Sequence, residues 1–312
     1  MINEPPLMIP LPKRFKTGIH NLYGKDGAHW LSALPVLRGS LFTRWSLEKA
    51  QPVSQLSYNY LEFAHSPLHG PVVLKIGFPN PEISTEIKAL EYYRSREGAV
   101  RLLDWDLENG ALLLERVLPG NDLTSLADDL QATRIAAKAM ITLHQPKPDG
   151  DDFPTMEKWC RAFTRYYDNF GEGGGPLPNV LFRNAFGLVQ ELLDSAEDQF
   201  LLHGDLHHYN LLLREDGCWI TIDPKGVIGE LACEAGPYLF NPIPDLIQRP
   251  ELLKVLSQRL EILAEITSID KQRLAAWSFC RAILGALWSL EEGKKNLAYR
   301  MEITETIGKL IK

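Results

Sequence analysis

Short apolar runs separated by turn-forming residues characterise the chain before about residue 118. The runs at residues 58–64 and 72–76 flank a segment with two prolines and a glycine, so together they predict a β-hairpin. A further apolar run at residues 111–114 predicts a strand, and Pro119 and Gly120 beyond it favour a turn. We therefore expect the first third of the chain to be rich in strands.

The pattern changes to helical periodicity after residue 122. Apolar residues there recur about every 3.6 positions, which is the spacing of one face of a helix. An earlier segment at residues 81–94 is also expected to be helical, because proline suits the first turn of a helix. Strands come first and helices follow, so the order favours an α+β fold over alternating βαβ units. The later predicted helices span residues 122–144, 155–170, 179–193, 251–266, 271–292 and 296–311.

Three polar residues stand out in a second strand-rich segment. Apolar runs at residues 200–202, 211–213 and 218–222 predict strands, and the turn residues between the last two predict a hairpin. Asp205 and Asn210 precede this hairpin, and Asp223 lies at its exit, so Asp223 is expected near Asn210. Each residue alone is compatible with a turn or a strand end. Their order in this context favours a chemical role.

The residue types of this trio suit phosphoryl transfer from a nucleotide. That reaction needs a carboxylate to orient or deprotonate the attacking hydroxyl, together with oxygen ligands for magnesium. Asp205 is the candidate catalytic residue. Asn210 and Asp223 are the candidate magnesium ligands, because they offer an amide carbonyl and a carboxylate.

Two motifs resemble the aminoglycoside phosphotransferase family, whose members share the protein-kinase fold. The first motif is His203-Gly-Asp-Leu-His-His-Tyr-Asn210, and the second is Ile222-Asp-Pro-Lys-Gly226. The second motif, with Gly229-Glu230 and Asn241-Pro242 downstream, most resembles the streptomycin and hydroxyurea kinase branch. The similarity extends from about Val53 to the C-terminus.

The resemblance implies a bilobal protein-kinase-like fold with ATP and Mg²⁺ as cofactors. It places a small β-rich, nucleotide-binding lobe at residues 1–118 and a larger, mainly helical lobe for catalysis and substrate binding at residues 119–312. No glycine-rich loop precedes the predicted strand at 72–76, so the nucleotide loop is assigned to the segment with Ser54 and Ser57. The first lobe ends in a hinge that is assigned to adenine recognition and consists of Glu115, Arg116, Val117 and Leu118.

Lys75 lies inside the apolar run at residues 72–76, which is unusual for a plain core strand. The kinase scheme places a lysine there that contacts nucleotide phosphates and pairs with a helix glutamate. The resemblance favours Glu86 over Glu82 as that glutamate, because of the apolar residues that follow Glu86. A lysine that faces solvent at a sheet edge is the alternative.

Candidate substrate contacts follow the second motif. Lys225 could neutralise phosphate oxygens or steer the substrate, and Glu230 and Glu234 could contact a cationic aminocyclitol. A solvated lysine and ordinary surface carboxylates are the alternatives. His203 is expected to hold the loop by hydrogen bonds rather than to act as a base. Neighbouring histidines lack further ligands at a regular spacing, so no zinc site is expected.

Composition narrows the class of protein further. The 312 residues are enough for two domains with their own cores, and a net charge of −7 leaves no basic footprint for nucleic acid. No apolar run reaches the roughly 18 residues of a membrane-spanning helix, and the N-terminus lacks the pattern of a secretion signal. Four separated cysteines are expected to be buried free thiols in a reducing compartment. We therefore expect a cytoplasmic protein with a small-molecule hydroxyl substrate, without a membrane or an obligate protein partner.

Three functions remain open. The first is an ATP-dependent O-phosphotransferase that acts on an aminoglycoside such as streptomycin. The second is a kinase of the same fold that acts on hydroxyurea or another small metabolite. The third is an inactive nucleotide-binding module. The intact polar trio and Lys75 count against the third, because a module that only binds a nucleotide does not need all four residues.

Overall fold

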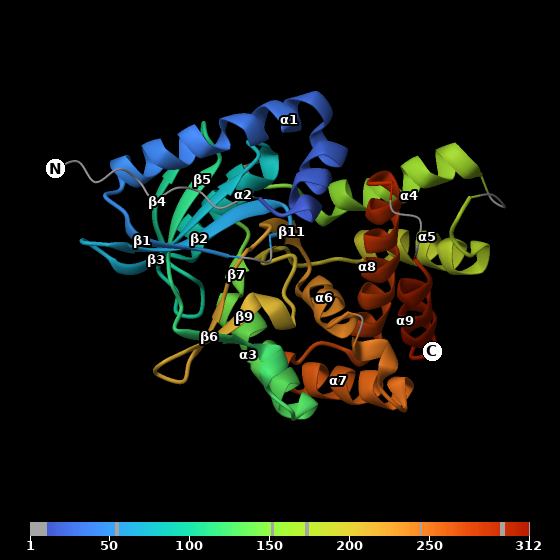
Figure 1. The fold of residues 1–312 in the computed structure, drawn as a ribbon. Coiled ribbons are helices and arrows are strands. Elements are labelled where there is room, and N and C mark those ends of the chain that lie inside the picture. The colour runs from blue at the N-terminus through green and yellow to red at the C-terminus, as the bar shows by residue number, and fades with distance from the viewer. Residues whose placement is uncertain are drawn as a thin grey trace. The chain divides into compact units, whose positions relative to one another are not determined.

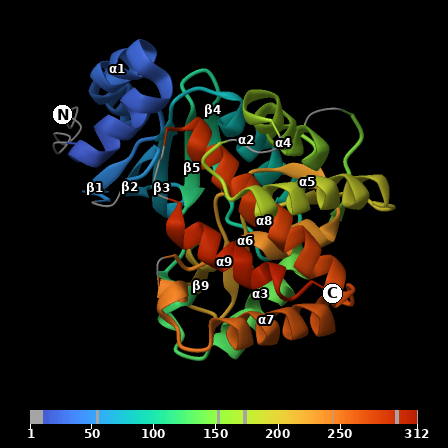
Figure 2. The ribbon, with the colours of Figure 1, turned by 90° about the vertical axis from the view of Figure 1, so that its right-hand side faces the viewer.

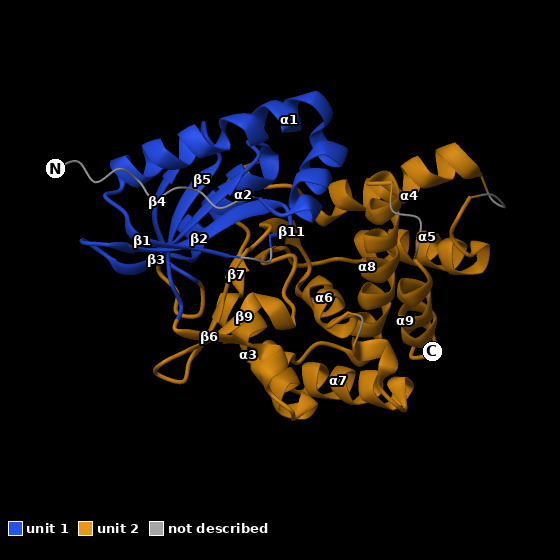
Figure 3. Cartoon of the chain, in the orientation of Figure 1, with its two compact units in different colours: residues 1–94, 100–117 blue, residues 95–99, 118–312 orange. Residues whose placement is uncertain are grey.

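The computed structural model describes residues 11–53, 56–150, 153–171, 175–243, 245–293 and 297–311. Contacts between residues divide the chain into two compact units (Figure 3). Unit 1 consists of residues 1–94 and 100–117, and unit 2 consists of residues 95–99 and 118–312. The chain therefore passes from unit 1 into unit 2 for the last time after Val117.

Unit 1 is built on a five-stranded sheet with the strand order β1-β2-β3-β5-β4, in which every neighbouring pair is antiparallel. The predicted hairpin is confirmed, because β2 and β3 pair along their whole length, from Asn59 opposite Gly77 to Ser66 opposite Gly70. The strands are β1 (Glu48–Pro52), β2 (Asn59–Ser66), β3 (Gly70–Gly77), β4 (Leu102–Asp106) and β5 (Ala111–Glu115).

A long helix, α1 (Lys13–Arg44), packs across one face of this sheet (Figure 1). It was not among the predicted elements. Gly24 adopts a non-helical conformation with φ +56° inside the helix, so its apolar residues do not follow one regular period. Pro35 also lies inside the helix, where a proline is unusual. The helix and sheet share one core with Phe15, Ile19, Leu34, Leu41, Tyr60, Val72, Leu74 and Ile76.

A buried ion pair joins α1 to the sheet. Arg38 on α1 donates two hydrogen bonds to the Glu62 carboxylate on β2, at 2.6 and 2.7 Å, and Tyr60 donates a third at 2.8 Å. Arg38 and Glu62 are 2% and 0% exposed. Each residue therefore compensates the buried charge of the other in the core of unit 1.

The opposite face of the sheet carries Lys75, because successive residues of a strand point to opposite sides. Helix α2 (Pro81–Tyr93) contributes Glu86 as the partner of this lysine. The helix begins as the sequence predicts, with Pro81 in its first turn and the Asn80 side chain accepting a hydrogen bond from the Ile83 amide.

Unit 2 is mainly helical, and α8 lies among its other helices (Figure 2). Most residues of α8 are buried, which explains why this helix is apolar almost all round. The helices are α3 (Asp129–Leu143), α4 (Met156–Phe170), α5 (Asn179–Asp194), α6 (Ala235–Leu239), α7 (Leu252–Thr267), α8 (Lys271–Glu291) and α9 (Ala298–Gly308), with short 3-10 helices η1 (Leu123–Ser125), η2 (His208–Asn210), η3 (Leu231–Glu234) and η4 (Asp245–Gln248).

Two small sheets in unit 2 hold the motifs. One has the order β10-β9-β6 and the other has the order β11-β8-β7. The predicted hairpin is confirmed, because β9 and β10 pair antiparallel from Leu211 opposite Thr221 to Leu213 opposite Trp219. The strands are β6 (Pro119–Asp122), β7 (Gln145–Pro146), β8 (Phe200–Leu202), β9 (Leu211–Arg214), β10 (Trp219–Thr221) and β11 (Val227–Gly229).

The predicted α+β class is confirmed, and most predicted helices agree with the structure within a few residues. The exception is the helix expected at residues 122–144. Asp122 caps only the short η1, and the long helix α3 begins after Asp128, whose side chain accepts hydrogen bonds from two backbone amides. The last helix was expected from Asn296, which lies outside the described residues, and it is described as Ala298–Gly308.

All four cysteines are free thiols, and Cys160, Cys233 and Cys280 are buried as predicted. The prediction was wrong for Cys218, which is exposed because it follows the turn between β9 and β10. Among the helices that the structure describes, none combines the length and the apolar character that crossing a membrane requires.

Replacing Arg38 with methionine should lower the free energy of unfolding by about 3 kcal/mol, because Glu62 would stay buried without its cationic partner and keep only the hydrogen bond from Tyr60. Urea unfolding measures this change. The matched control is Arg101→Met, because Arg101 also pairs with a glutamate in unit 1, Glu115, but is 69% exposed. An equal loss in the two variants would show that burial does not set the strength of the Arg38 pair.

Candidate functional site

The first motif forms a loop at residues 203–210, which we call the 203–210 loop, directly after β8. His203 is fully buried, and burial lowers its pKa to about 4, so its ring is neutral. Its Nε2 lies 2.9 Å from the Ile222 carbonyl, and its Nδ1 accepts a hydrogen bond from the Asp205 amide at 3.3 Å. The ring therefore ties the loop to the exit of β10, which confirms the structural role predicted for His203.

Glu234 at the end of η3 holds the same loop from another side. Its two carboxylate oxygens accept hydrogen bonds from consecutive backbone amides, that of His203 at 2.9 Å and that of Gly204 at 2.7 Å. Both amides belong to the segment that leads into Asp205. When Glu234 is ionised, these hydrogen bonds are about twice as strong as neutral ones, and they then place the backbone before Asp205 firmly.

Gly204 is required for this arrangement. Its φ of +82° lies in the left-handed region that favours glycine. A Cβ atom added there would lie 2.9 Å from Val227 Cγ1 and 3.0 Å from Trp159 Cη2. Any larger residue would therefore shift the loop away from β11 and α4.

Glu234 is 2% exposed, and burial raises its pKa to about 7. The amides of Gly204 and His203 and the positive charge of Arg281 oppose that shift, while Asp205 adds to it. In this geometry Glu234 holds the backbone of the 203–210 loop.

Glu230 is likewise engaged within unit 2. Its carboxylate accepts hydrogen bonds from the Arg273 guanidinium and, at 2.9 Å, from the indole N–H of Trp277. These contacts link the start of η3 to α8. The Glu230 side chain is 15% exposed.

Asp205, Asn210 and the exit of β10 are brought together as expected. The Asn210 side-chain N–H₂ donates to the Asp205 backbone carbonyl at 2.9 Å, and the Ile222 amide donates to the Asn210 carbonyl at 3.0 Å. Asp223 follows directly and has φ +58°, a left-handed conformation that aspartate tolerates better than most residues. The Asp205 side chain is 38% exposed.

The residues at this place fit a magnesium ion. The side-chain nitrogen of Asn210, Nδ2, donates to the loop, so the side-chain oxygen, Oδ1, is the atom that remains for a metal. Asp223 adds a carboxylate, and Mg²⁺ is commonly bound by one or two protein oxygens with phosphates and waters completing its shell. Within the described part of the chain, no group of three or more His, Cys, Asp or Glu residues gathers as a closed metal site would require.

Lys225 is bound to the same loop through its backbone. Its amide donates to the His203 carbonyl at 2.7 Å, and the Gly226 amide approaches that carbonyl at 3.3 Å. These bonds fix the segment after Asp223 against the start of the 203–210 loop. The side chain of Lys225 is half-buried.

A second buried network, which the sequence did not reveal, holds the other end of the loop. Arg259 on α7 is 0% exposed and donates to Asp129 at 2.9 and 2.6 Å and to the Asn241 carbonyl at 2.7 Å. The His208 ring stacks on Tyr238 at 4.4 Å and lies beside the Arg259 guanidinium. Burial and Arg259 hold the pKa of His208 well below its ordinary value, so this ring is neutral.

In unit 1, the Lys75 ammonium lies 2.7 and 2.8 Å from the two Glu86 oxygens. Lys75 is 2% exposed and Glu86 is 6% exposed. The pairing with Glu86 rather than Glu82 is confirmed, and the alternative of a solvent-facing Lys75 is wrong. A lysine held this way is a fixed positive charge within the sheet of unit 1.

The other residues predicted to contact the nucleotide are Ser54, Ser57 and residues 115–118. Ser57 is exposed, and Ser54 lies outside the described residues. Glu115 accepts two hydrogen bonds from Arg101, and the Arg116 guanidinium lies 3.8 Å from the centre of the Phe63 ring. Val117 is buried and precedes Leu118, where the chain enters unit 2.

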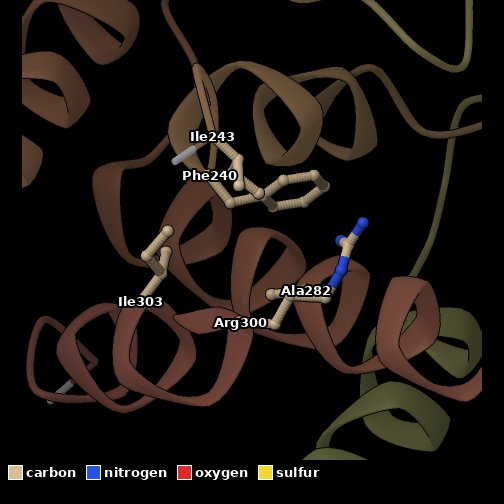
Figure 4. Close-up of a pocket in the computed structure, with 5 residues that line it drawn as sticks. All are labelled: Phe240, Ile243, Ala282, Arg300 and Ile303. Carbon is tan, nitrogen blue, oxygen red and sulfur yellow. The ribbon is translucent and has the colours of Figure 1, made fainter. Parts of the chain in front are cut away.

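Two hollows in unit 2 lie apart from the polar trio. One has a volume of about 400 Å³ and is lined by Glu230, Arg273 and residues at the start of β8. The other is a small hollow between α6, α8 and α9, where Phe240, Ile243, Ala282, Arg300 and Ile303 come together (Figure 4). Asp205, Asn210 and Asp223 line neither of them.

Comparison with known proteins supports the family that the two motifs resemble. Residues 44–293 match the family described as aminoglycoside/hydroxyurea antibiotic resistance kinase. A streptomycin 6-kinase from Streptomyces glaucescens is 29% identical over 298 residues, which cover 93% of this chain and 94% of that protein. A hydroxyurea phosphotransferase from Kitasatospora aureofaciens is 28% identical, with coverage of 89% and 79%.

Solved structures show the same fold at low sequence identity. The choline kinase LicA from Streptococcus pneumoniae superposes with a TM-score of 0.63 at 14% identity, covering 89% of this chain and 98% of that chain. Another structure of LicA, in complex with AMP, has the same TM-score. The protein-kinase-like fold predicted from the sequence is therefore confirmed.

The pKa of Glu234 predicts how turnover depends on pH. As the pH falls through about 7, Glu234 becomes protonated and is a weaker acceptor for the two loop amides. We therefore expect kcat to fall over this range. In Glu234→Gln, which cannot titrate, kcat should be lower throughout and should lose this acidic limb. A limb that is unchanged in Glu234→Gln would contradict this account.

Proposed function

Because the chain belongs to the family of aminoglycoside/hydroxyurea antibiotic resistance kinases and is a phosphotransferase for a hydroxyl acceptor, we propose that it transfers the ATP γ-phosphate to an aminoglycoside of the streptomycin type. The observation that carries this proposal is the placement of Asp205. Its backbone is fixed by Glu234 and His203, and its side chain is partly exposed beside Asn210 and the exit of β10.

In the proposed reaction, Asp205 orients the acceptor hydroxyl and takes its proton. A bond forms between the hydroxyl oxygen and the γ-phosphorus, and the bond from that phosphorus to the leaving ADP oxygen breaks. Asn210 and Asp223 would hold Mg²⁺. When bound, the ion neutralises charge that develops on the phosphate oxygens. No phosphorylated form of the enzyme is required.

The nucleotide is proposed to bind through unit 1. Lys75, held by Glu86, would contact the phosphates, and Ser57 would belong to the loop that covers them. The segment 115–118 would recognise adenine with its backbone groups. In this scheme residues 1–118 form the nucleotide-binding lobe, and residues 119–312 form the lobe for catalysis and substrate binding.

Two relatives indicate candidates for the acceptor. The relative from Streptomyces glaucescens favours streptomycin, and the net charge of −7 is compatible with a cationic ligand. The relative from Kitasatospora aureofaciens supports hydroxyurea as a second candidate. Lys225 remains a candidate for steering the phosphate or the acceptor, whereas the contacts of Glu230 and Glu234 point to structural roles.

A coupled assay for ADP release with streptomycin, related aminoglycosides, hydroxyurea and simple amino alcohols tests the acceptor. Streptomycin or a close relative should stimulate ADP release most strongly. Stimulation by hydroxyurea alone would exclude the aminoglycoside and keep the kinase. No stimulation by any of these compounds would contradict the proposed acceptor class.

With the acceptor identified, Asp205→Asn should lower kcat by roughly a hundredfold or more, because the amide cannot take the hydroxyl proton. The KM for ATP should change little, since Asp205 acts on the acceptor. The matched control is Asp216→Asn, at the exposed turn between β9 and β10, which should retain wild-type turnover. Near wild-type kcat in Asp205→Asn would remove Asp205 from the reaction.

ATP should raise the melting temperature more strongly in the presence of magnesium, because a ligand that binds only the folded state stabilises it. Asp223→Asn should lose most of this magnesium-dependent increment and keep the effect of ATP alone. Asp216→Asn again serves as the control. An equal shift with ATP in excess chelator would contradict the assignment of Asn210 and Asp223 to the metal.

A further inference from the structure

The carbonyl of Gly204 belongs to the peptide bond that leads into Asp205. Arg281 on α8 donates from its Nη2 to this carbonyl oxygen at 2.6 Å. The arginine is 5% exposed, and it comes from a helix that the sequence motifs do not include. The same short backbone segment is therefore held on its amide side by a buried carboxylate, Glu234, and on its carbonyl side by a buried guanidinium.

Two tryptophans enclose the Arg281 side chain. The guanidinium carbon lies 5.1 Å from the ring centre of Trp159 on α4 and 5.9 Å from that of Trp288 on α8. The two indoles contact each other edge to face, with ring centres 5.2 Å apart. At Gly236, a Cβ atom would lie 2.6 Å from the Arg281 Cβ, so α6 also packs directly against this side chain. Arg281 therefore has little freedom to move.

The cost of burying Arg281 argues against a simple packing role. Its Nε and Nη1 are buried and have no hydrogen-bond partner among the residues that the structure describes. A buried donor without a partner costs about 1–3 kcal/mol, which the cation–π contacts offset only in part. An apolar side chain could fill the space without this cost, so the bond to Gly204 is the feature that accounts for an arginine.

Charge links Arg281 to Glu234 as well. The positive guanidinium lowers the pKa of Glu234 and so favours its ionised, amide-accepting form, whereas Asp205 acts in the opposite direction. His203 and Gly204 contribute backbone amides, and the Cys160 thiol on α4 is held neutral because burial raises its pKa to about 12. Arg281 is therefore the cation that favours ionised Glu234 beside the 203–210 loop.

We propose that Arg281 is a positioning residue for phosphotransfer, which fixes the Gly204–Asp205 peptide directly and supports Glu234 on its other side. The inference rests on the proposed role of Asp205. It assigns a function to α8 that the motifs of the 203–210 loop and of β10 do not contain.

Two variants test it. Arg281→Met removes the charge and the donor, and Arg281→Lys keeps the charge with a smaller donor group. Arg281→Met should lower kcat roughly tenfold to a hundredfold, as is typical when a group that orients a reactive residue is lost. The KM for ATP should change less than about threefold, because no substrate contact is removed. Arg281→Lys should recover part of kcat.

Hydrogen exchange supplies a readout that does not depend on the acceptor. In Arg281→Met, the amides of residues 203–206 should exchange faster, while those of β9 and β10 should keep wild-type rates. The acidic limb of the kcat profile should also move to higher pH, since Glu234 loses the cation that favours its ionised form. The matched control is Arg300→Met on α9, whose Nε is also buried without a partner but which does not touch the loop.

Unchanged loop exchange and unchanged kcat in Arg281→Met would overturn the proposal. Faster exchange throughout unit 2, with no recovery in Arg281→Lys and equal losses in Arg300→Met, would also overturn it, because it would assign Arg281 to packing. If the wild-type chain transfers no phosphate to any acceptor, the proposed function fails. The exchange experiment then still decides whether Arg281 holds the 203–210 loop.

Discussion

The two oxygens of Glu234 accept hydrogen bonds from consecutive backbone amides, and the conformation of the 203–210 loop depends on that contact. When two consecutive amides donate to one buried carboxylate, the backbone of the residues that follow can adopt few other conformations. Gly204 supplies the left-handed conformation, and Arg281 holds the next carbonyl. The contacts of neighbouring residues therefore set the backbone conformation at Asp205, and with it the direction in which the Asp205 side chain points.

The rest of unit 2 supports this constraint from both ends of the loop. Glu234 and Arg281 act at its beginning, whereas Arg259 and Asp129 hold the region of His208 near its end. Each support is a charged or polar group buried with partners, which costs stability unless the geometry is good. Such groups define one arrangement of the backbone, which suits the proposed roles of Asp205, Asn210 and Asp223.

The sequence indicates candidate residues for the chemistry more readily than the residues that hold them in place. Asp205, Asn210 and Asp223 lie in short, ordered motifs. The Lys75–Glu86 pair was predicted from the apolar run around Lys75 together with the family resemblance, and the structure contains it. Helix α1 was missed because a kink at Gly24 breaks its periodicity. The roles of Glu234 and Arg281 depend on contacts between distant segments, which no local spacing encodes.

The central claim is that this arrangement moves a phosphoryl group from ATP to a hydroxyl oxygen. The most direct measurement follows the phosphate itself, with ATP labelled in its γ-phosphate and mass spectrometry of the acceptor after incubation with the wild-type chain. The account predicts one labelled phosphate on a hydroxyl of the acceptor and an equal amount of ADP. Label found only as inorganic phosphate, with the acceptor unmodified, would contradict it.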